Sequence, residues 1–212
     1  GLPIYVRLLD VGADKPLPFL EMPRERNPSL GQRGIRFLRQ HPELLRTQLE
    51  ALLKLSADFD LHILVPMVTL PSDIETVNQV LKELSSKGTT LRMPKIGAMI
   101  ETPAAALNAA EILKYAEFLS FGTNDLTQYT FAADRENEAV DAYFDDTHNV
   151  IFRLLQTVHD DVPNIPLSVC GELAGRSEAV SRLVQCGITS LSVVPTLVPV
   201  IKEAVRNGSK AP

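Results

Sequence analysis

Strand-like and helix-like segments alternate about six times along the chain, and this alternation restricts the fold more than any other feature of the sequence. Short apolar runs rich in β-branched residues predict the strands. Longer segments with apolar residues three or four positions apart predict the helices. Strands separated by helices pair in parallel through right-handed crossovers. Because the sequence has no internal repeat or low-complexity linker, we predict one α/β domain over residues 1–212.

The boundaries of these segments follow from the apolar runs and from the turn residues between them. The long helical segment is expected to divide near His41 and Pro42. Ser72 and Glu75 have the spacing of a capping box at the start of a helix. Strands are predicted at residues 3–10, 61–68, 95–101, 118–121, 166–172 and 190–194, and helices at 29–57, 72–85, 104–115, 150–160, 177–185 and 197–205.

Acidic side chains are predicted at the ends of two neighbouring strands. Glu101 ends the strand at 95–101, and Asp125 follows the next strand in the polar sequence Thr123-Asn124-Asp125. Ligands of parallel α/β proteins bind at the carboxyl ends of the strands. Two carboxylates that converge there repel each other unless a cation lies between them, and oxygen ligands without His or Cys suit Mg²⁺ or Mn²⁺. An ordinary polar turn at 123–125 stays open as the simpler interpretation.

Other polar residues occur at the same end of their predicted strands. Arg7 lies near the end of the first strand, where an unpaired arginine would cost several kcal/mol to bury, and Cys170 and Glu172 end the strand at 166–172. Polar residues at the carboxyl ends of successive strands are typical of a TIM-type barrel. A closed barrel needs eight strands, and about six are present. We therefore predict an incomplete (β/α)8 barrel and expect that sequence before Gly1 is missing.

The composition excludes several classes of protein. The 212 residues include 45% hydrophobic and 22% charged residues, as in an ordinary globular protein. The net charge of -5 argues against nucleic acid or an anionic membrane as a partner. The chain has two cysteines, Cys170 and Cys186, which form no disulfide framework and are consistent with a reducing cytoplasm. The four histidines occur in no metal-ligand spacing, so we interpret them as structural.

Five motifs in order resemble those of the C-terminal, phosphoenolpyruvate-binding barrel of PEP-protein phosphotransferases. Pyruvate phosphate dikinase and PEP synthase share much of this pattern, but Tyr129 and the pair Leu173-Ala174 favour the phosphotransferases. The motifs are VRLLDVGADK (6–15), NPSLGQRGIR (27–36), IGAMIETPAAA (96–106), FGTNDLTQYTFAADR (121–135) and CGELAG (170–175).

The resemblance implies a binding role for four residues. Arg7 and Arg33 would hold the phosphoryl group, because forked guanidinium donors match phosphate oxygens. Asn124 and Arg135 would position the carboxylate and phosphate of PEP. Without the resemblance, Arg33 and Arg135 would be interpreted as surface or helix-end charges.

The resemblance also implies a metal site and a proton donor. Glu101 and Asp125 would bind Mg²⁺, and Cys170 would protonate C3 of the departing enolpyruvate. Without the resemblance, Cys170 would be interpreted as a small buried hydrophobic residue. The segment 193–196, Val-Val-Pro-Thr, departs from the small polar sequence usual in these proteins.

The implied activity is transfer of the phosphoryl group from PEP to a histidine on a separate N-terminal domain and then to a phosphocarrier protein, with release of pyruvate. A cytoplasmic homodimer is the expected assembly, and the resemblance covers both the branch that takes part in sugar transport and its nitrogen-regulatory relative. Because the first two barrel strands are absent, the fragment alone is expected to be inactive. Three alternatives remain: a dikinase-like or PEP synthase-like domain, a metal-dependent pyruvate-enolate lyase, and a PEP-sensing or dimerisation module without activity.

Overall fold

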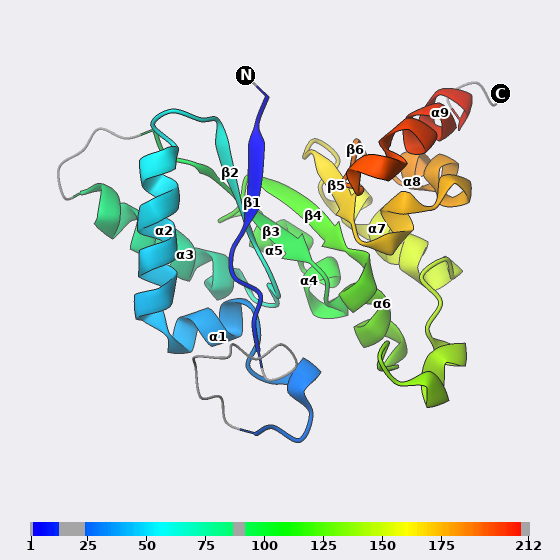
Figure 1. Ribbon diagram of the computed structural model, residues 1–212, viewed down its shortest axis with the longest axis horizontal. Helices are drawn as coiled ribbons and strands as arrows, with labels where there is room; N and C mark the ends of the chain where they lie inside the picture. Colours follow the sequence, from blue (N-terminus) through cyan, green and yellow to red (C-terminus); the bar gives the residue numbers. More distant parts are fainter. Residues whose placement is uncertain (1, 13–23, 87–91, 209–212) are drawn as a thin grey trace. The chain divides into compact units, whose positions relative to one another are not determined.

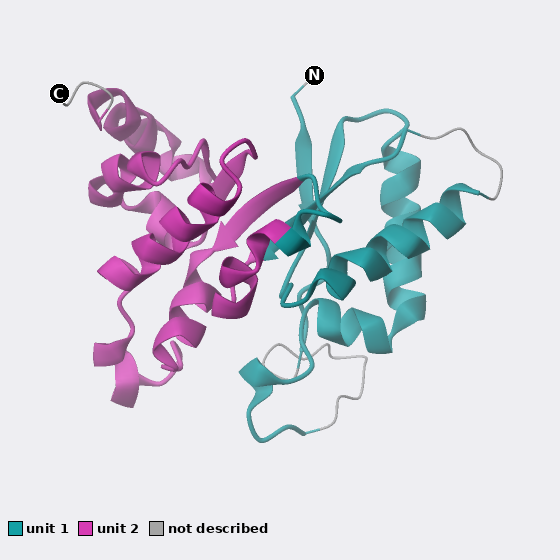
Figure 2. Cartoon of the chain, turned by 180° about the vertical axis from the view of Figure 1, so that it is seen from behind, with its two compact units in different colours: residues 1–99, 111–117 teal, residues 100–110, 118–212 magenta. Residues whose placement is uncertain are grey.

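The computed structural model describes residues 2–12, 24–86 and 92–208 (Figure 1). The chain forms two compact units, which are coloured separately in Figure 2. Unit 1 comprises residues 1–99 and 111–117, and unit 2 comprises residues 100–110 and 118–212. Most of residues 11–28, which connect the first predicted strand to the first predicted helix, lies outside the described residues. Within the described ranges, none of the helices has the length and apolar character needed to cross a membrane.

Unit 1 is built on parallel strands that pair in sequence order. The register joins Ile63 of one strand to Val6 on one side and to Ile96 on the other. All residues of the middle strand are buried, as expected for a parallel strand covered on both faces. The three strands are β1 (Ile4–Arg7), β2 (Leu61–Val65) and β3 (Lys95–Ile100), of which the last residue belongs to unit 2.

Three helices of unit 1 pack beside these strands: α1 (Ile35–Gln40), α2 (Pro42–Leu55) and α3 (Pro71–Ser85) (Figure 1). A 3-10 helix, η1 (Pro28–Leu30), precedes them. The predicted division of the long helix is confirmed, because α1 ends before His41 and Pro42 opens α2. Leu45, Leu49 and Leu53 form the buried stripe of α2, and each contributes about 1.5–3 kcal/mol by burial.

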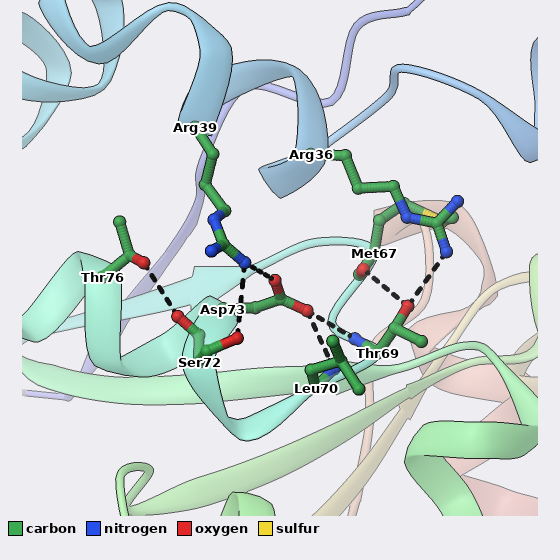
Figure 3. Close-up of polar contacts among 8 residues, drawn as sticks. All are labelled: Arg36, Arg39, Met67, Thr69, Leu70, Ser72, Asp73 and Thr76. Atoms are coloured by element: carbon green, nitrogen blue, oxygen red, sulfur yellow. Dashed lines mark hydrogen bonds and ion pairs between the residues drawn. The ribbon is translucent and has the colours of Figure 1, made fainter.

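The start of α3 differs from the predicted capping box. Pro71 occupies the first helical position, so the third position falls on Asp73 rather than on Glu75. The Asp73 carboxylate accepts hydrogen bonds from the backbone N–H groups of Thr69 and Leu70, both at 2.9 Å (Figure 3). Asp73 therefore has, toward the N-cap residue Leu70, the role that Glu75 was expected to have toward Ser72.

Unit 2 repeats the strand-helix alternation. Its strands pair in parallel in sequence order, with Phe121 opposite Val169 and Val169 opposite Leu191. Phe121, Leu126, Leu155 and Val169 lie in its core. The strands are β4 (Phe118–Gly122), β5 (Leu167–Cys170) and β6 (Ser190–Leu191), and the α-helices are α4 (Pro103–Leu107), α6 (Thr123–Phe131), α7 (Asn149–Asp161), α8 (Val180–Gln185) and α9 (Val198–Gly208).

Several predicted elements are shorter than expected. The helix predicted at 104–115 is interrupted at Asn108, which lies outside the helical region (φ -122°, ψ 23°), and continues as α5 (Ala109–Ile112). The strand predicted at 166–172 stops at Cys170, because Gly171 has φ +104°. The strand predicted at 190–194 has two residues. Short 3-10 helices fill the connections: η2 (Glu138–Tyr143), η3 (Glu172–Gly175), η4 (Ser177–Ala179) and η5 (Pro195–Leu197).

The α/β class and the count of about six strands are confirmed: the described residues contain six strands, with helices between them. In each unit the paired strands among the described residues run parallel. The polar residues predicted at strand ends accordingly lie at or shortly after the carboxyl ends of β1, β3, β4 and β5.

Candidate functional site

Two buried carboxylates follow neighbouring strands along the chain, and both belong to unit 2. Glu101 comes directly after β3 and is 1% exposed. Asp125 is 6% exposed and lies in the first turn of α6, which begins directly after β4. The polar sequence Thr123-Asn124-Asp125 is therefore helical and not the turn considered above. A carboxylate in the first turn of a helix is stabilised by the positive end of the helix dipole.

Gly122 links these two carboxylates, because it leaves room for Glu101 at the start of α6. A Cβ atom at position 122 would lie 3.0 Å from the Cβ of Glu101 and 3.3 Å from its Cδ, and would collide with one carboxylate oxygen. The Glu101 carboxylate thus packs against the residue that immediately precedes α6. This contact requires a glycine for reasons of space, since the backbone at Gly122 has an ordinary negative φ of -92°.

Cys170 ends β5 beside β4, and its thiol has defined hydrogen-bond partners. Its Sγ–H donates to the carbonyl oxygen of Phe121 at 3.3 Å, and the Ser120 hydroxyl donates to Sγ at 3.8 Å. The Thr123 hydroxyl donates to the carbonyl oxygen of Cys170 at 3.2 Å. The side chain of Cys170 therefore lies against the end of β4 and the first residue of α6. Ser120 was not singled out in the sequence, because a serine within a buried strand carries no local signal of this contact.

Gly171 and Asn124 connect the end of β5 to the same helix start. Gly171 lies in the left-handed region, and a Cβ there would come within 2.6 Å of Thr123 Oγ1 and 2.9 Å of Asn124 Oδ1. The oxygen of the Asn124 side chain accepts a hydrogen bond from the backbone N–H of Glu172 at 3.0 Å. This bond fixes the amide of Asn124 beside Cys170, with its oxygen directed toward η3.

A pocket of about 690 Å³ opens in unit 2 beside these groups. Its polar lining comes mainly from the residues after β5, and its apolar lining comes from the segment after β6. The lining residues are Asn124, Cys170, Gly171, Glu172, Gly175, Arg176, Ser192, Val193, Val194 and Leu197. The segment 193–196, which was noted as unusual in the sequence, thus contributes two of the apolar walls.

Arg176 brings a cation to this pocket and forms a two-point ion pair with Asp146. Its Nε and Nη2 atoms lie 3.2 and 3.1 Å from the two carboxylate oxygens of Asp146. Burial raises the pKa of Asp146, and the neighbouring Arg176 guanidinium partly offsets this effect. Arg176 was not predicted, although it directly follows the CGELAG motif.

In unit 1 the two predicted phosphate-binding arginines converge on one carboxylate. Arg33 Nη2 lies 3.3 Å from Asp10 Oδ2, and Arg7 Nη1 lies 3.5 Å from the same oxygen. The side chains of Arg33 and Asp10 are each 1% exposed, whereas that of Arg7 is 48% exposed. Asp10 therefore compensates the buried charge of Arg33, which would otherwise be strongly destabilising. Sequence reasoning missed Asp10, although it lies within the VRLLDVGADK motif.

A comparison with known protein families shows which family this chain belongs to. The family model described as "PEP-utilising enzyme, PEP-binding domain" matches residues 1–209. The chain belongs to this family. The resemblance inferred from the five motifs is thereby confirmed, and enzymes of the PEP-utilising family generally use a divalent metal ion.

Individual relatives agree with the family assignment. A multiphosphoryl transfer protein of Rhodobacter capsulatus is 38% identical over 213 residues, which is 100% of this chain and 26% of the relative. Phosphoenolpyruvate-protein phosphotransferases of Borreliella burgdorferi and Haemophilus influenzae are each 37% identical, cover 96% and 95% of this chain, and are themselves covered to 37% and 36%. The chain thus spans roughly a quarter to two fifths of the length of such relatives.

A solved structure confirms the fold class. A pyruvate kinase from Cryptosporidium parvum superposes with a TM-score of 0.57 over 77% of this chain and 34% of the kinase, at 14% identity. This degree of identity is informative about the fold alone. Because pyruvate kinase has a TIM-type barrel, the likeness supports the TIM-type class of α/β fold for this PEP-utilising family member.

The backbone of Arg135 follows α6 and bonds a residue in the second half of that helix. The chain turns at Ala132, which has φ 51°, and the backbone N–H of Arg135 bonds Oε1 of Gln128 at 3.0 Å. Arg135 therefore lies beside the second half of α6, whereas Asn124 and Asp125 lie in its first turn. The sequence-predicted residues consequently form a group in unit 2, namely Glu101, Asn124, Asp125 and Cys170, and a pair in unit 1, namely Arg7 and Arg33.

The side chains of unit 2 are suited to a hard divalent cation of the kind that this family uses. Glu101 and Asp125 offer oxygen ligands only, and both are buried. The described residues contain no group of three or more His, Cys, Asp or Glu side chains able to hold a metal ion. Two carboxylates with the remaining positions left to water and substrate oxygens match the usual coordination of Mg²⁺ in phosphate-handling sites.

Proposed function

We propose that this chain is the PEP-binding domain of a phosphotransferase that passes the phosphoryl group of PEP to a histidine elsewhere in the whole protein and releases pyruvate. The observation that carries the proposal is that Cys170 and Asn124 line one pocket beside the helix start that holds Asp125. Residues 1–212 would act as one incomplete TIM-type barrel domain. The names of the relatives favour this function over a pyruvate-enolate lyase.

The proposed substrate-binding groups are Arg7, Arg33, Asn124 and Arg135. Arg7 and Arg33 would hold the phosphoryl oxygens, and Asp10 already orients both guanidinium groups. Because Asp10 pairs with both guanidinium groups, a phosphoryl group that binds them would compete with this carboxylate. Asn124, fixed by its bond to Glu172, and Arg135 would position the carboxylate and phosphate of PEP.

Glu101 and Asp125 are the proposed ligands of Mg²⁺, with Mn²⁺ as the substitute. When bound, the ion would neutralise charge on the carboxylate and phosphate oxygens of PEP and on the enolate that forms from it. Both carboxylates depend on the chain at Gly122: Glu101 packs against this glycine, and Asp125 belongs to the helix that starts after it.

Cys170 is the proposed proton donor to carbon. The bond between phosphorus and the enol oxygen breaks, the phosphoryl group bonds to a histidine nitrogen, and the electron pair stays with the enolate. C3 of the enolate then takes the proton from Sγ and becomes the methyl group of pyruvate. The hydroxyl of Ser120 remains as a hydrogen-bond donor to the resulting thiolate.

The proposal extends to the whole protein. A phosphocarrier protein would receive the phosphoryl group from the histidine, and the enzyme would act as a cytoplasmic homodimer in sugar uptake. Relatives are named phosphoenolpyruvate-protein phosphotransferase and multiphosphoryl transfer protein. These names support the part of the proposal that concerns transfer of the phosphoryl group.

Isothermal titration of the whole protein with PEP and with pyruvate, each with and without Mg²⁺, tests the function. We expect PEP to bind more tightly than pyruvate and to require Mg²⁺. Equal affinities for the two ligands would contradict a phosphate-binding role for the arginines and support a lyase. Mg²⁺-dependent binding of PEP without phosphorylation of a histidine would instead identify a sensing module.

A further inference from the structure

The main chain at Arg33 is held from two directions. Residues Gly12 and Arg33 form an antiparallel β-bridge, and the N–H of Gly34 donates to the carbonyl oxygen of Val11 at 3.1 Å. The N–H of Ile35 donates to the carbonyl oxygen of Pro66 at 3.2 Å. The segments that follow β1 and β2 therefore both fix the backbone from which the Arg33 side chain extends.

This attachment needs a close backbone approach. Gly34 has φ +54°, and a Cβ there would come within 2.8 Å of Met67 Cβ. Met67 itself has φ 57°, which is uncommon for a residue with a side chain. The position of Arg33 thus depends on an accurate fit between the start of α1 and the loop after β2.

Arg36 joins these two parts through its side chain. Its Nη1 donates to the carbonyl oxygen of Leu30 at 3.0 Å, and its Nη2 donates to Thr69 Oγ1 at 3.2 Å (Figure 3 shows the second bond). The Thr69 hydroxyl in turn donates to the carbonyl oxygen of Met67 at 3.3 Å. One guanidinium therefore connects η1, which precedes Arg33, with the loop that packs against Gly34.

Arg39, a second arginine of α1, makes different contacts and serves as a comparison for Arg36. Arg39 Nη1 lies 2.7 Å from Asp73 Oδ1 and 3.4 Å from Ser72 Oγ, at the start of α3 (Figure 3). Arg36 and Arg39 are three residues apart on α1 and both bond the region after β2. Arg39 bonds residues of α3, whereas Arg36 bonds Leu30 in the segment that carries Arg33.

We propose that Arg36 is a positioning residue for PEP binding that acts through Arg33. The guanidinium group of Arg36 holds the segment 27–33 against the loop after β2, so that the Arg33 guanidinium keeps the orientation needed for a phosphoryl group. Two donors set at a fixed angle are required, so lysine, with a single ammonium group, is a poor substitute. The inference rests on the proposed function, because it takes Arg33 as a phosphoryl-binding residue.

A double-mutant cycle on the whole protein tests the inference. The variants are Arg33→Ala, Arg36→Ala and the double variant, with Arg36→Lys and Arg39→Ala as comparisons. PEP affinity is measured by isothermal titration in the presence of Mg²⁺, and Tm is recorded for each variant. Arg36→Ala should weaken PEP binding about tenfold, or about 1.4 kcal/mol, but by less than about twofold in the Arg33→Ala background.

The comparison variants separate positioning from general stability. Arg39→Ala should lower Tm and leave PEP affinity unchanged. Arg36→Lys should restore Tm more fully than PEP affinity. If Arg36→Ala cannot be purified folded, Thr69→Val removes one acceptor of the Arg36 guanidinium and should weaken PEP binding in the same direction by a smaller factor.

The outcomes distinguish this inference from the proposed function. If Arg33→Ala weakens PEP binding and Arg36→Ala does not, the positioning role is overturned and the function stands. If Arg36→Ala weakens PEP affinity by the same factor in the wild-type and Arg33→Ala backgrounds, Arg36 does not act through Arg33 and the inference is again wrong. If Arg33→Ala leaves PEP affinity unchanged, the phosphoryl-binding role proposed for Arg33 fails, and the inference fails with it.

Discussion

Gly122→Ala tests whether the space beside Glu101 is needed for the metal site. The substitution adds one methyl group at a position where the backbone angles suit alanine, so its effect comes from the contact with Glu101. The added Cβ would lie 3.0 Å from the Cβ of Glu101 and 3.3 Å from its Cδ, and nearer still to one carboxylate oxygen. Glu101 is 1% exposed, so its side chain has little room to move away.

The expected size of the effect follows from these contacts. An extra methyl group in a well-packed interior typically costs about 1–3 kcal/mol. For a domain of this size, each kcal/mol lowers the Tm of that domain's own unfolding transition by about 2–4 °C. The displaced carboxylate should also lose its place at the start of α6. We therefore expect a lower Tm together with a loss of the Mg²⁺ dependence of PEP binding.

The assay compares Gly122→Ala with Gly208→Ala in the whole protein. At Gly208 the nearest atoms to an added Cβ are 3.6 Å away, which is an ordinary contact. Isothermal titration gives PEP affinity as a function of Mg²⁺ concentration, and thermal unfolding gives Tm. Gly208→Ala should change neither quantity appreciably. Unchanged Mg²⁺ dependence in Gly122→Ala would refute the argument that Glu101 must occupy this space to hold the ion.

Three further predictions concern unit 2. Cys170→Ala should slow conversion of PEP to pyruvate in the whole protein much more than it weakens PEP binding. Cys170→Ser should restore little activity because a hydroxyl is several pKa units less acidic than a thiol. Near-normal turnover in Cys170→Ala would contradict the donor role. Ser120→Ala removes the hydroxyl that donates to Sγ, so iodoacetamide should alkylate Cys170 more slowly at a given pH, and an unchanged rate, measured by mass spectrometry, would contradict this. Burial raises the pKa of Asp146 above 3.8, so the folded state binds this proton more readily and the contribution of Asp146 to folding stability falls as pH rises past 3.8. Hydrogen bonds from Thr147 lower the pKa of Asp145, so the contribution of that residue to stability changes with pH in the opposite direction. The pH dependence of the free energy of unfolding should therefore change in opposite directions for Asp146→Asn and Asp145→Asn, and equal changes would contradict the assignment.

The order of strands and helices could be predicted from the sequence because apolar periodicity is a local property. The same pattern placed Glu101 and Asp125 after neighbouring strands. Details at the ends of elements could not be predicted, since they depend on single backbone positions. Pro71 moved the cap of α3 to Asp73, and Gly171 ended β5 two residues early.

The contacts that organise the candidate site are less accessible to sequence reasoning because they join distant residues. Asp10 and Arg33 are 23 positions apart, and Arg36 and Thr69 are 33 positions apart. Ser120 meets Cys170 across 50 positions. No local spacing rule connects such pairs, so Asp10, Ser120 and Arg36 were recognised from the fold. The sequence indicated Asp10 and Arg36 only through the motifs that contain them, VRLLDVGADK and NPSLGQRGIR.

The carboxylate shared by Arg7 and Arg33 has a consequence for the release of product. Asp10 Oδ2 lies 3.3 Å from the guanidinium of Arg33, so this carboxylate competes with every anion that binds there. If these arginines hold the phosphoryl group as proposed, the dianionic phosphate of PEP displaces Asp10. Once that group has moved to the histidine, the remaining monoanion competes poorly, and Asp10 returns to the arginines. The resting ion pair would then help pyruvate to leave and keep weaker anions out of the site between turnovers.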